Sequence, residues 1–150
     1  DDGEIVAVTC ADETAERNNL VKFWDVAAHR RIVGFCVRTF DIPTLIQRSR
    51  LLEVPYPALR LSRYDSSDVL DLHDVLTFQD QRQEALMPRS LKAFARRFGI
   101  PVEDDTTGEQ IGALVDAGNW AAILAHVRSD VQLTVALARR LGVMLEPEVF

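Results

Sequence analysis

The chain has 150 residues, of which 47% are hydrophobic and 27% charged, and its formal net charge is -6. This composition excludes a disordered chain and fits one globular domain with its own core, which we place at residues 1–150. No apolar run approaches the roughly 18–20 residues that cross a bilayer. The acidic start, Asp1-Asp2-Gly3-Glu4, is unlike a signal or transit peptide. The charge argues mildly against nucleic-acid binding over the whole surface, but it does not exclude a local site.

The first half of the chain predicts two short strands and two helices. The apolar runs 4–10 and 31–37 are short and rich in β-branched residues, which favours buried strands. Each run holds one cysteine, and we expect Cys10 and Cys36 to be small buried residues of a reducing, cytoplasmic protein. Apolar residues at helical spacing predict helices over 15–30, after an N-cap at Thr14, and over 40–54.

The second half of the chain predicts mainly helices. Residues 69–72 fit either a strand or the start of a short helix, and pattern does not separate the two. Helices are expected over 90–100, 109–118 and 120–141. Ser90 and Asn119 serve as N-caps, and Gly99, Gly118 and Gly142 mark the three predicted ends. Strands near the beginning followed by helices indicate an α/β fold.

Carboxylates at the edges of predicted elements are the candidates for chemistry, because glycine-rich phosphate loops, cysteine-rich zinc motifs and a nucleophile elbow are absent from the sequence. Asp41 lies just beyond a predicted buried strand, at the end where open α/β sheets place their ligands. An N-cap of the following helix is the alternative interpretation, since Pro43 lies in the first turn.

His126 and Asp130 are four residues apart on the last predicted helix, so their side chains lie on the same face. Their spacing alone also fits a solvated polar stripe. Apolar neighbours such as Val127 and Val131 indicate that part of this face packs against protein. A carboxylate held there without a partner is costly, and a metal ion would remove that cost.

Taken in order, these segments resemble a known family. The stretch "VGFCVRTFDIPTLIQRS" resembles the second motif of the ribonuclease H-like DEDD 3′–5′ exonucleases, in which a strand leads through a loop into Phe-Asp at a helix start. The segment "SLKAFARRFGI…TGEQIGALVDAGNWAAILAHVRSDVQLTVALARRLG" resembles their third motif and the helices before it, and "SSDVLDLHDVL" resembles the segment between the two motifs. The likeness spans roughly residues 4–143 and is closest to exonuclease domains related to family B DNA polymerases.

The resemblance implies a ribonuclease H-like mixed sheet flanked by helices and metal-dependent hydrolysis of phosphodiesters at single-stranded 3′ ends, with DNA favoured over RNA. In the family, four carboxylates hold two Mg²⁺ or Mn²⁺ ions that generate hydroxide and stabilise the leaving oxygen. Carried over, Asp41 and Asp130 are metal ligands, and His126 orients or deprotonates the attacking water. No membrane is implied.

The sequence departs from the family pattern at three places. His126 occupies the spacing at which the family usually has Tyr, and Cys36 replaces the usual Asn of the second motif. The only Asp-x-Glu near the start, Asp2-Gly3-Glu4, follows no strand, so we expect the fold to lack its first strand with two carboxylates. With only two ligands left, the chain would hold one hydrated cation weakly, or none.

Three hypotheses therefore stay open. The first is an exonuclease in which Asp41 and Asp130 converge on one metal site. The second is an inactive ribonuclease H-like module that binds nucleic acid or a protein, with phosphate contacts from arginines of the stretches 30–32, 48–50 and 95–99. The third is an unrelated α/β domain, in which no sheet brings residue 41 next to residue 130.

Overall fold

The computed structural model describes residues 5–77 and 89–143, which belong to two compact units. The first comprises Cys10–Met87 and is called the sheet unit; the second comprises Asp1–Thr9 and Pro88–Phe150 and is called the helical unit. Their described parts hold six helices and one two-stranded sheet. The chain therefore has the mixed α/β composition that the sequence predicts, while the single domain and the ribonuclease H-like topology stay predictions.

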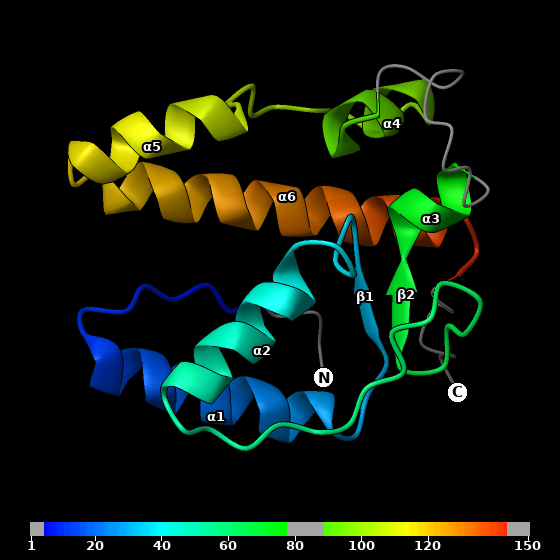
Figure 1. Cartoon of the computed structure of the whole chain (residues 1–150). Coiled ribbons are helices and arrows are strands. Elements are labelled where there is room, and N and C mark those ends of the chain that lie inside the picture. Colours follow the sequence, from blue (N-terminus) through cyan, green and yellow to red (C-terminus); the bar gives the residue numbers. More distant parts are fainter. Residues whose placement is uncertain (1–4, 78–88, 144–150) are drawn as a thin grey trace, which may run out of the picture. The chain divides into compact units, whose positions relative to one another are not determined.

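The sheet unit alternates helices and strands along the chain (Figure 1). Its elements are α1 Glu13–Ala27, β1 Ile32–Gly34, α2 Asp41–Leu51, β2 Val69–Asp71 and α3 Leu72–Leu76. The two strands pair in parallel, with Ile32 opposite Val69 and Gly34 opposite Asp71. Because parallel strands end at the same edge, the loop after β1 and the start of α3 come together there. The segment 69–72 is thus both of the predicted alternatives, a strand that passes directly into a helix.

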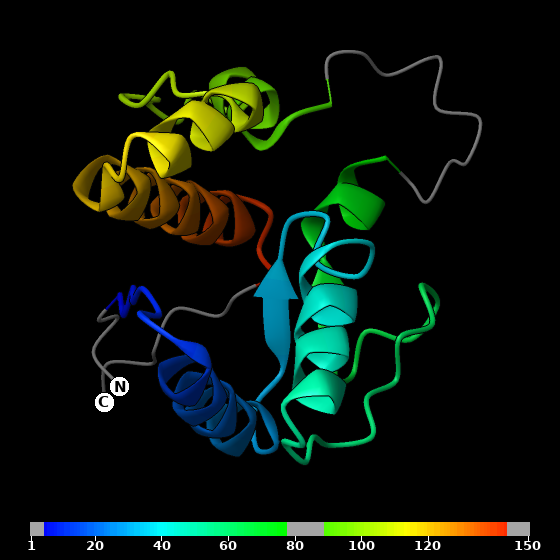
Figure 2. The ribbon, with the colours of Figure 1, turned by 60° about the vertical axis from the view of Figure 1, so that its left-hand side comes forward.

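The core of the sheet unit lies between α1, α2 and the two strands; Figure 2 shows α2 beside β1. Its buried side chains come from α1, α2, β2 and the loops: Leu20, Trp24, Ala27, Val37, Ile42, Val54 and Val69. Ile32 of β1 packs against them and is partly buried. The indole N–H of Trp24 donates to Ser49 Oγ at 2.7 Å, and that hydroxyl donates to the Leu45 carbonyl at 2.7 Å. Buried polar groups need such partners, so this chain of bonds fixes α1 against α2.

The helical unit consists of α4 Leu91–Arg97, α5 Gly108–Asp116 and α6 Trp120–Arg140. In Figures 1 and 2, α4 and α5 both lie along the long helix α6. The predicted N-caps are confirmed: Ser90 Oγ accepts from the Ala93 N–H, and Asn119 Oδ1 accepts from the Ala122 N–H, each at 3.2 Å. The buried side chains of α4 and α6 are Phe94, Ala95, Leu133, Leu137 and Ala138.

The predicted strand over 4–10 is wrong within its described part, residues 5–10, which form no regular structure. Val6 is 78% exposed and Val8 is 58% exposed, so their side chains join no core. A strand needs a neighbour for its backbone groups, and no described strand pairs with this segment. Residue 4 lies outside the described residues. Cys10 is likewise exposed rather than buried.

Two smaller differences concern the helix and strand that follow. Asp12, not Thr14, caps α1, because its carboxylate accepts from the Ala15 N–H at 2.8 Å. The predicted strand 31–37 shortens to three residues, Ile32–Gly34. The chain bends after Gly34, and Cys36 has a left-handed φ of 57°. Among the described residues, no helix is both long and apolar enough to cross a membrane.

Candidate metal and nuclease site

The helix α6 places His126 and Asp130 on one face, as their spacing predicts. His126 Nε2 lies 3.5 Å from Asp130 Oδ2, and the two side chains are 13% and 39% exposed. This distance is too long for a good hydrogen bond. Thr134, one turn further on, donates its hydroxyl to the Asp130 carbonyl at 2.8 Å. The pair is therefore half-buried and held on one face of the helix, and no good hydrogen bond joins its two side chains.

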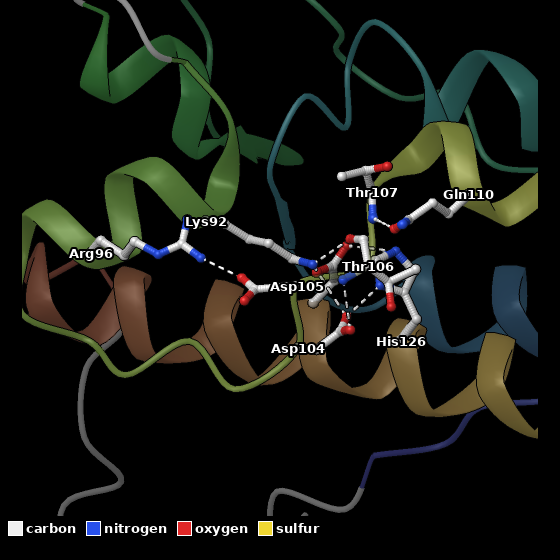
Figure 3. A network of polar contacts seen from close by, with 9 residues as sticks. Lys92, Arg96, Asp104, Asp105, Thr106, Thr107, Gln110 and His126 are labelled. Carbon is white, nitrogen blue, oxygen red and sulfur yellow. Dashed lines mark hydrogen bonds and ion pairs between the residues drawn. The ribbon is translucent and has the colours of Figure 1, made fainter.

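Asp104 joins this pair from the loop between α4 and α5, and sequence reasoning missed it. Its Oδ2 lies 2.6 Å from His126 Nδ1, and its Oδ1 accepts from the Thr106 N–H at 2.9 Å. Lys92 on α4 donates to the same Oδ2 at 3.2 Å (Figure 3). Bonds from the Thr106 and His126 side chains, then from the Thr106 backbone, hold the pKa of Asp104 well below its usual range. Asp104 is therefore a carboxylate that stays ionised.

Asp104, His126 and Asp130 together offer oxygen and nitrogen atoms that lie within 4.8 Å of one another. Within the described parts of the chain, Asp130 Oδ1 is buried and has no hydrogen-bond partner. A buried, unpaired carboxylate oxygen is costly, and a divalent cation would satisfy it. Asp130 is thus the residue of this cluster that suits a divalent cation, because Asp104 Oδ2 is already bonded to His126 and Lys92.

Asp41 belongs to the sheet unit, where it is the first residue of α2. The N-cap position is taken by Phe40, so the interpretation of Asp41 as an N-cap is wrong. Desolvation, followed by repulsion from Asp71, raises the pKa of the Asp41 carboxyl. A carboxylate destabilised by a neighbouring negative charge gains from a bound cation. Asp41 is therefore chemically suited to the role of a metal ligand.

Asp71 is the last residue of β2, at the edge of the sheet where β1 also ends, and it is only 2% exposed. Its Oδ1 accepts from the backbone N–H groups of Cys36 at 2.9 Å and His73 at 3.0 Å, and its Oδ2 accepts from that of Arg38 at 3.1 Å. Burial, and then the charges of nearby carboxylates led by Asp71, raise the pKa of the Cys36 thiol to about 11. Asp71 thus anchors the loop from which α2 and Asp41 start.

Comparison with known families supplies the decisive observation. A family model described as "Predicted 3'-5' exonuclease related to the exonuclease domain of PolB" matches residues 2–145. The chain belongs to this family. The exonuclease-related family assignment covers both units, with Asp41 in one and the His126–Asp130 pair in the other. Searches of curated proteins and of solved structures found no match.

In this exonuclease-related chain, several arginines of the stretches considered for phosphate binding bind acidic or aromatic side chains instead. Arg48 makes two bonds of 2.6 Å to the Glu16 carboxylate, and Arg96 donates to Asp105 at 2.6 Å. Arg50 donates to the hydroxyl of Tyr56 at 2.8 Å. Phosphate binding by Arg48 would have to compete with a bidentate ion pair, which is the strongest arrangement available to a guanidinium group.

Proposed function

We propose that the chain is a metal-dependent 3′–5′ exonuclease in which Asp41 and Asp130 are metal ligands and His126 acts on the attacking water. The supporting observation is the His126–Asp130 pair on α6, with one buried carboxylate oxygen that has no hydrogen-bond partner among the described residues. Family membership supports the reaction class, and the raised pKa of Asp41 supports its role as a ligand.

The residues divide the chemistry between them. A divalent cation, when bound, supplies positive charge that stabilises the phosphate oxygens and the leaving 3′ oxygen. Asp130 and Asp41 supply the negative charge that such a cation requires. His126 accepts a proton from water at Nε2, the ring nitrogen that faces Asp130, and imidazole is suited to this role near neutral pH. The expected substrate is a single-stranded 3′ end, with DNA preferred over RNA.

The test is trimming of a 5′-labelled single-stranded oligonucleotide by the full chain over a Mn²⁺ titration. We expect a ladder of products shortened from the 3′ end in the presence of Mn²⁺ and none with chelator. Asp130→Asn and Asp41→Asn should each remove the ladder, because each removes a charged ligand. Asp116→Asn, an exposed residue at the end of α5, is the matched control and should trim like the wild type.

Trimming by Asp130→Asn or Asp41→Asn at the wild-type rate would refute the assigned ligands, and absence of trimming by the wild type at any metal concentration would refute the activity. A wild type that binds the strand in a salt-dependent manner without shortening it would instead support the inactive module.

A further inference from the structure

We propose that Asp104 is a positioning residue that holds the His126 ring in the tautomer with its proton on Nδ1. The inference rests on the proposed function only for its catalytic consequence, because the tautomer itself is a property of the folded chain. Asp104 lies 22 residues before His126, on the loop between α4 and α5, outside the sequence segments quoted for the family resemblance. Its Oδ2 is 2.6 Å from His126 Nδ1 (Figure 3).

The chemistry of the two groups determines which nitrogen carries the proton. An ionised carboxylate only accepts hydrogen bonds, so the ring nitrogen at 2.6 Å must donate. Contacts from two other residues keep Asp104 in this state and this orientation. Thr106 donates its backbone N–H to Oδ1, and Lys92 Nζ bridges Oδ2 at 3.2 Å and the Thr106 carbonyl at 2.5 Å. Lys92 on α4 and Thr106 on the same loop thus fix the orientation of the Asp104 carboxylate independently of His126.

A proton on Nδ1 has a direct consequence at the opposite nitrogen. In a neutral imidazole, Nε2 then carries the lone pair and can only accept a proton. This nitrogen faces Asp130 Oδ2 at 3.5 Å, and two acceptors at that distance stabilise neither group. A water molecule that donates to both would relieve the conflict. The tautomer therefore places an acceptor at the position where the proposed function needs one.

The histidine tautomer can be measured directly by NMR of the ring nitrogens, independently of activity. The chain has three histidines, and the His126 signals are assigned by their loss in His126→Gln. At a pH where the ring is neutral, we expect the wild type to show protonated Nδ1 and unprotonated Nε2. In Asp104→Ala, the ring should revert to the Nε2–H form that free imidazole favours. Asp104→Asn, whose amide oxygen still accepts, should keep the larger share of the Nδ1–H form.

The control variant is Asp105→Asn, which changes the neighbouring carboxylate that binds Arg96 and is 83% exposed; it should leave the His126 signals unchanged. The inference is overturned if the wild-type ring carries its proton on Nε2, or if Asp104→Ala leaves the tautomer as it was. A circular-dichroism spectrum and melting curve establish that each variant is folded, and the wild-type spectrum, which must show protonated Nδ1, carries the test if Asp104→Ala does not fold.

Kinetics separate this inference from the proposed function. If the wild type trims, Asp104→Ala should lower kcat with little change in KM, by about 10- to 100-fold, as for the outer-shell carboxylates that orient metal-ligating histidines. Asp104→Asn should recover part of that loss. A wild type that does not trim refutes the proposed function, while the NMR result still decides the tautomer. A trimming wild type whose kcat is unaffected by Asp104→Ala refutes the positioning role.

Discussion

Asp71→Asn tests how firmly the loop that leads to Asp41 is held in the sheet unit. Asp71 is buried at the end of β2, and its two oxygens accept three backbone N–H bonds from the loop after β1 and the start of α3. Oδ1 takes two of these bonds, from Cys36 and His73, and Oδ2 takes the third, from Arg38. An asparagine can keep an oxygen at the position of Oδ1. Its amide nitrogen then takes the place of Oδ2, so two hydrogen-bond donors, this amide and the Arg38 N–H, face each other.

The expected loss in the free energy of unfolding follows from the number of backbone N–H donors left without a partner. An unsatisfied, partly buried N–H costs about 1 kcal/mol at the low end of its range. Asp71→Asn should therefore lower the free energy of unfolding by about 1 kcal/mol, and Asp71→Ala, which frees three donors, by about 3 kcal/mol. Removing the negative charge should also lower the pKa of Asp41, which repulsion from Asp71 helps to raise.

Urea unfolding followed by tryptophan fluorescence measures this effect. The chain has two tryptophans, and a Trp120→Phe background leaves Trp24, buried in the core of the sheet unit, as the reporter. Asp25→Asn, at an exposed position of α1, is the control and should change the free energy by less than about 0.5 kcal/mol. If Asp71→Ala and Asp71→Asn both fall within the control range, or if the two losses are equal, the assignment of three separate bonds to this carboxylate is wrong.

Three further predictions concern single residues. Because burial raises the pKa of the Cys36 thiol to about 11, iodoacetamide at pH 8 should alkylate the exposed Cys10 first, as followed by peptide mass spectrometry; equal rates would contradict this. The pKa of Asp104 is lowered, so its contribution to stability is present above the ordinary aspartate range and is lost as the pH falls. The difference in urea midpoint between wild type and Asp104→Asn should therefore shrink from pH 7 to pH 3, and a constant difference would refute the assignment. Gly34→Ala places a Cβ 2.7 Å from a side-chain carbon of the following loop and should cost about 1–3 kcal/mol in thermal or urea unfolding, whereas Gly112→Ala, with no described atom within 4 Å of the new Cβ, should not destabilise the chain.

Local signals account for the elements that the sequence predicts well. The start of α6 is marked by the side chain of Asn119, and its end by Gly142, which has the left-handed φ of 68° that favours glycine. Ser90 and Gly99 mark α4 in the same way. The positions of His126 and Asp130 on one face follow from helical spacing alone. These features depend on residues within a few positions, which is why pattern is sufficient for them.

Features that depend on distant partners could not be predicted. The apolar run 4–10 has the composition of a strand, but its described part pairs with no described strand. Asp104 stands in a polar loop whose composition carries no functional signal, and its contact with His126 arises only when that loop packs against α6. In the sequence, Asp71 stands in a short apolar segment with no functional signal. In the structure, its carboxylate accepts hydrogen bonds from three backbone N–H groups, one of them 35 residues away. Tertiary packing, not local pattern, determines each of these roles.

Titration with Mn²⁺ followed by NMR tests the central claim most directly, because the paramagnetic ion broadens the signals of nuclei close to it. If Asp41 and Asp130 are metal ligands, the ring signals of His126 and the amide signal of Asp41 should each broaden as Mn²⁺ is added. Asp130→Asn should weaken the broadening of the His126 ring signals. His126 ring signals that broaden equally in Asp130→Asn, or an Asp41 amide signal that Mn²⁺ leaves unchanged, would contradict the assigned ligands.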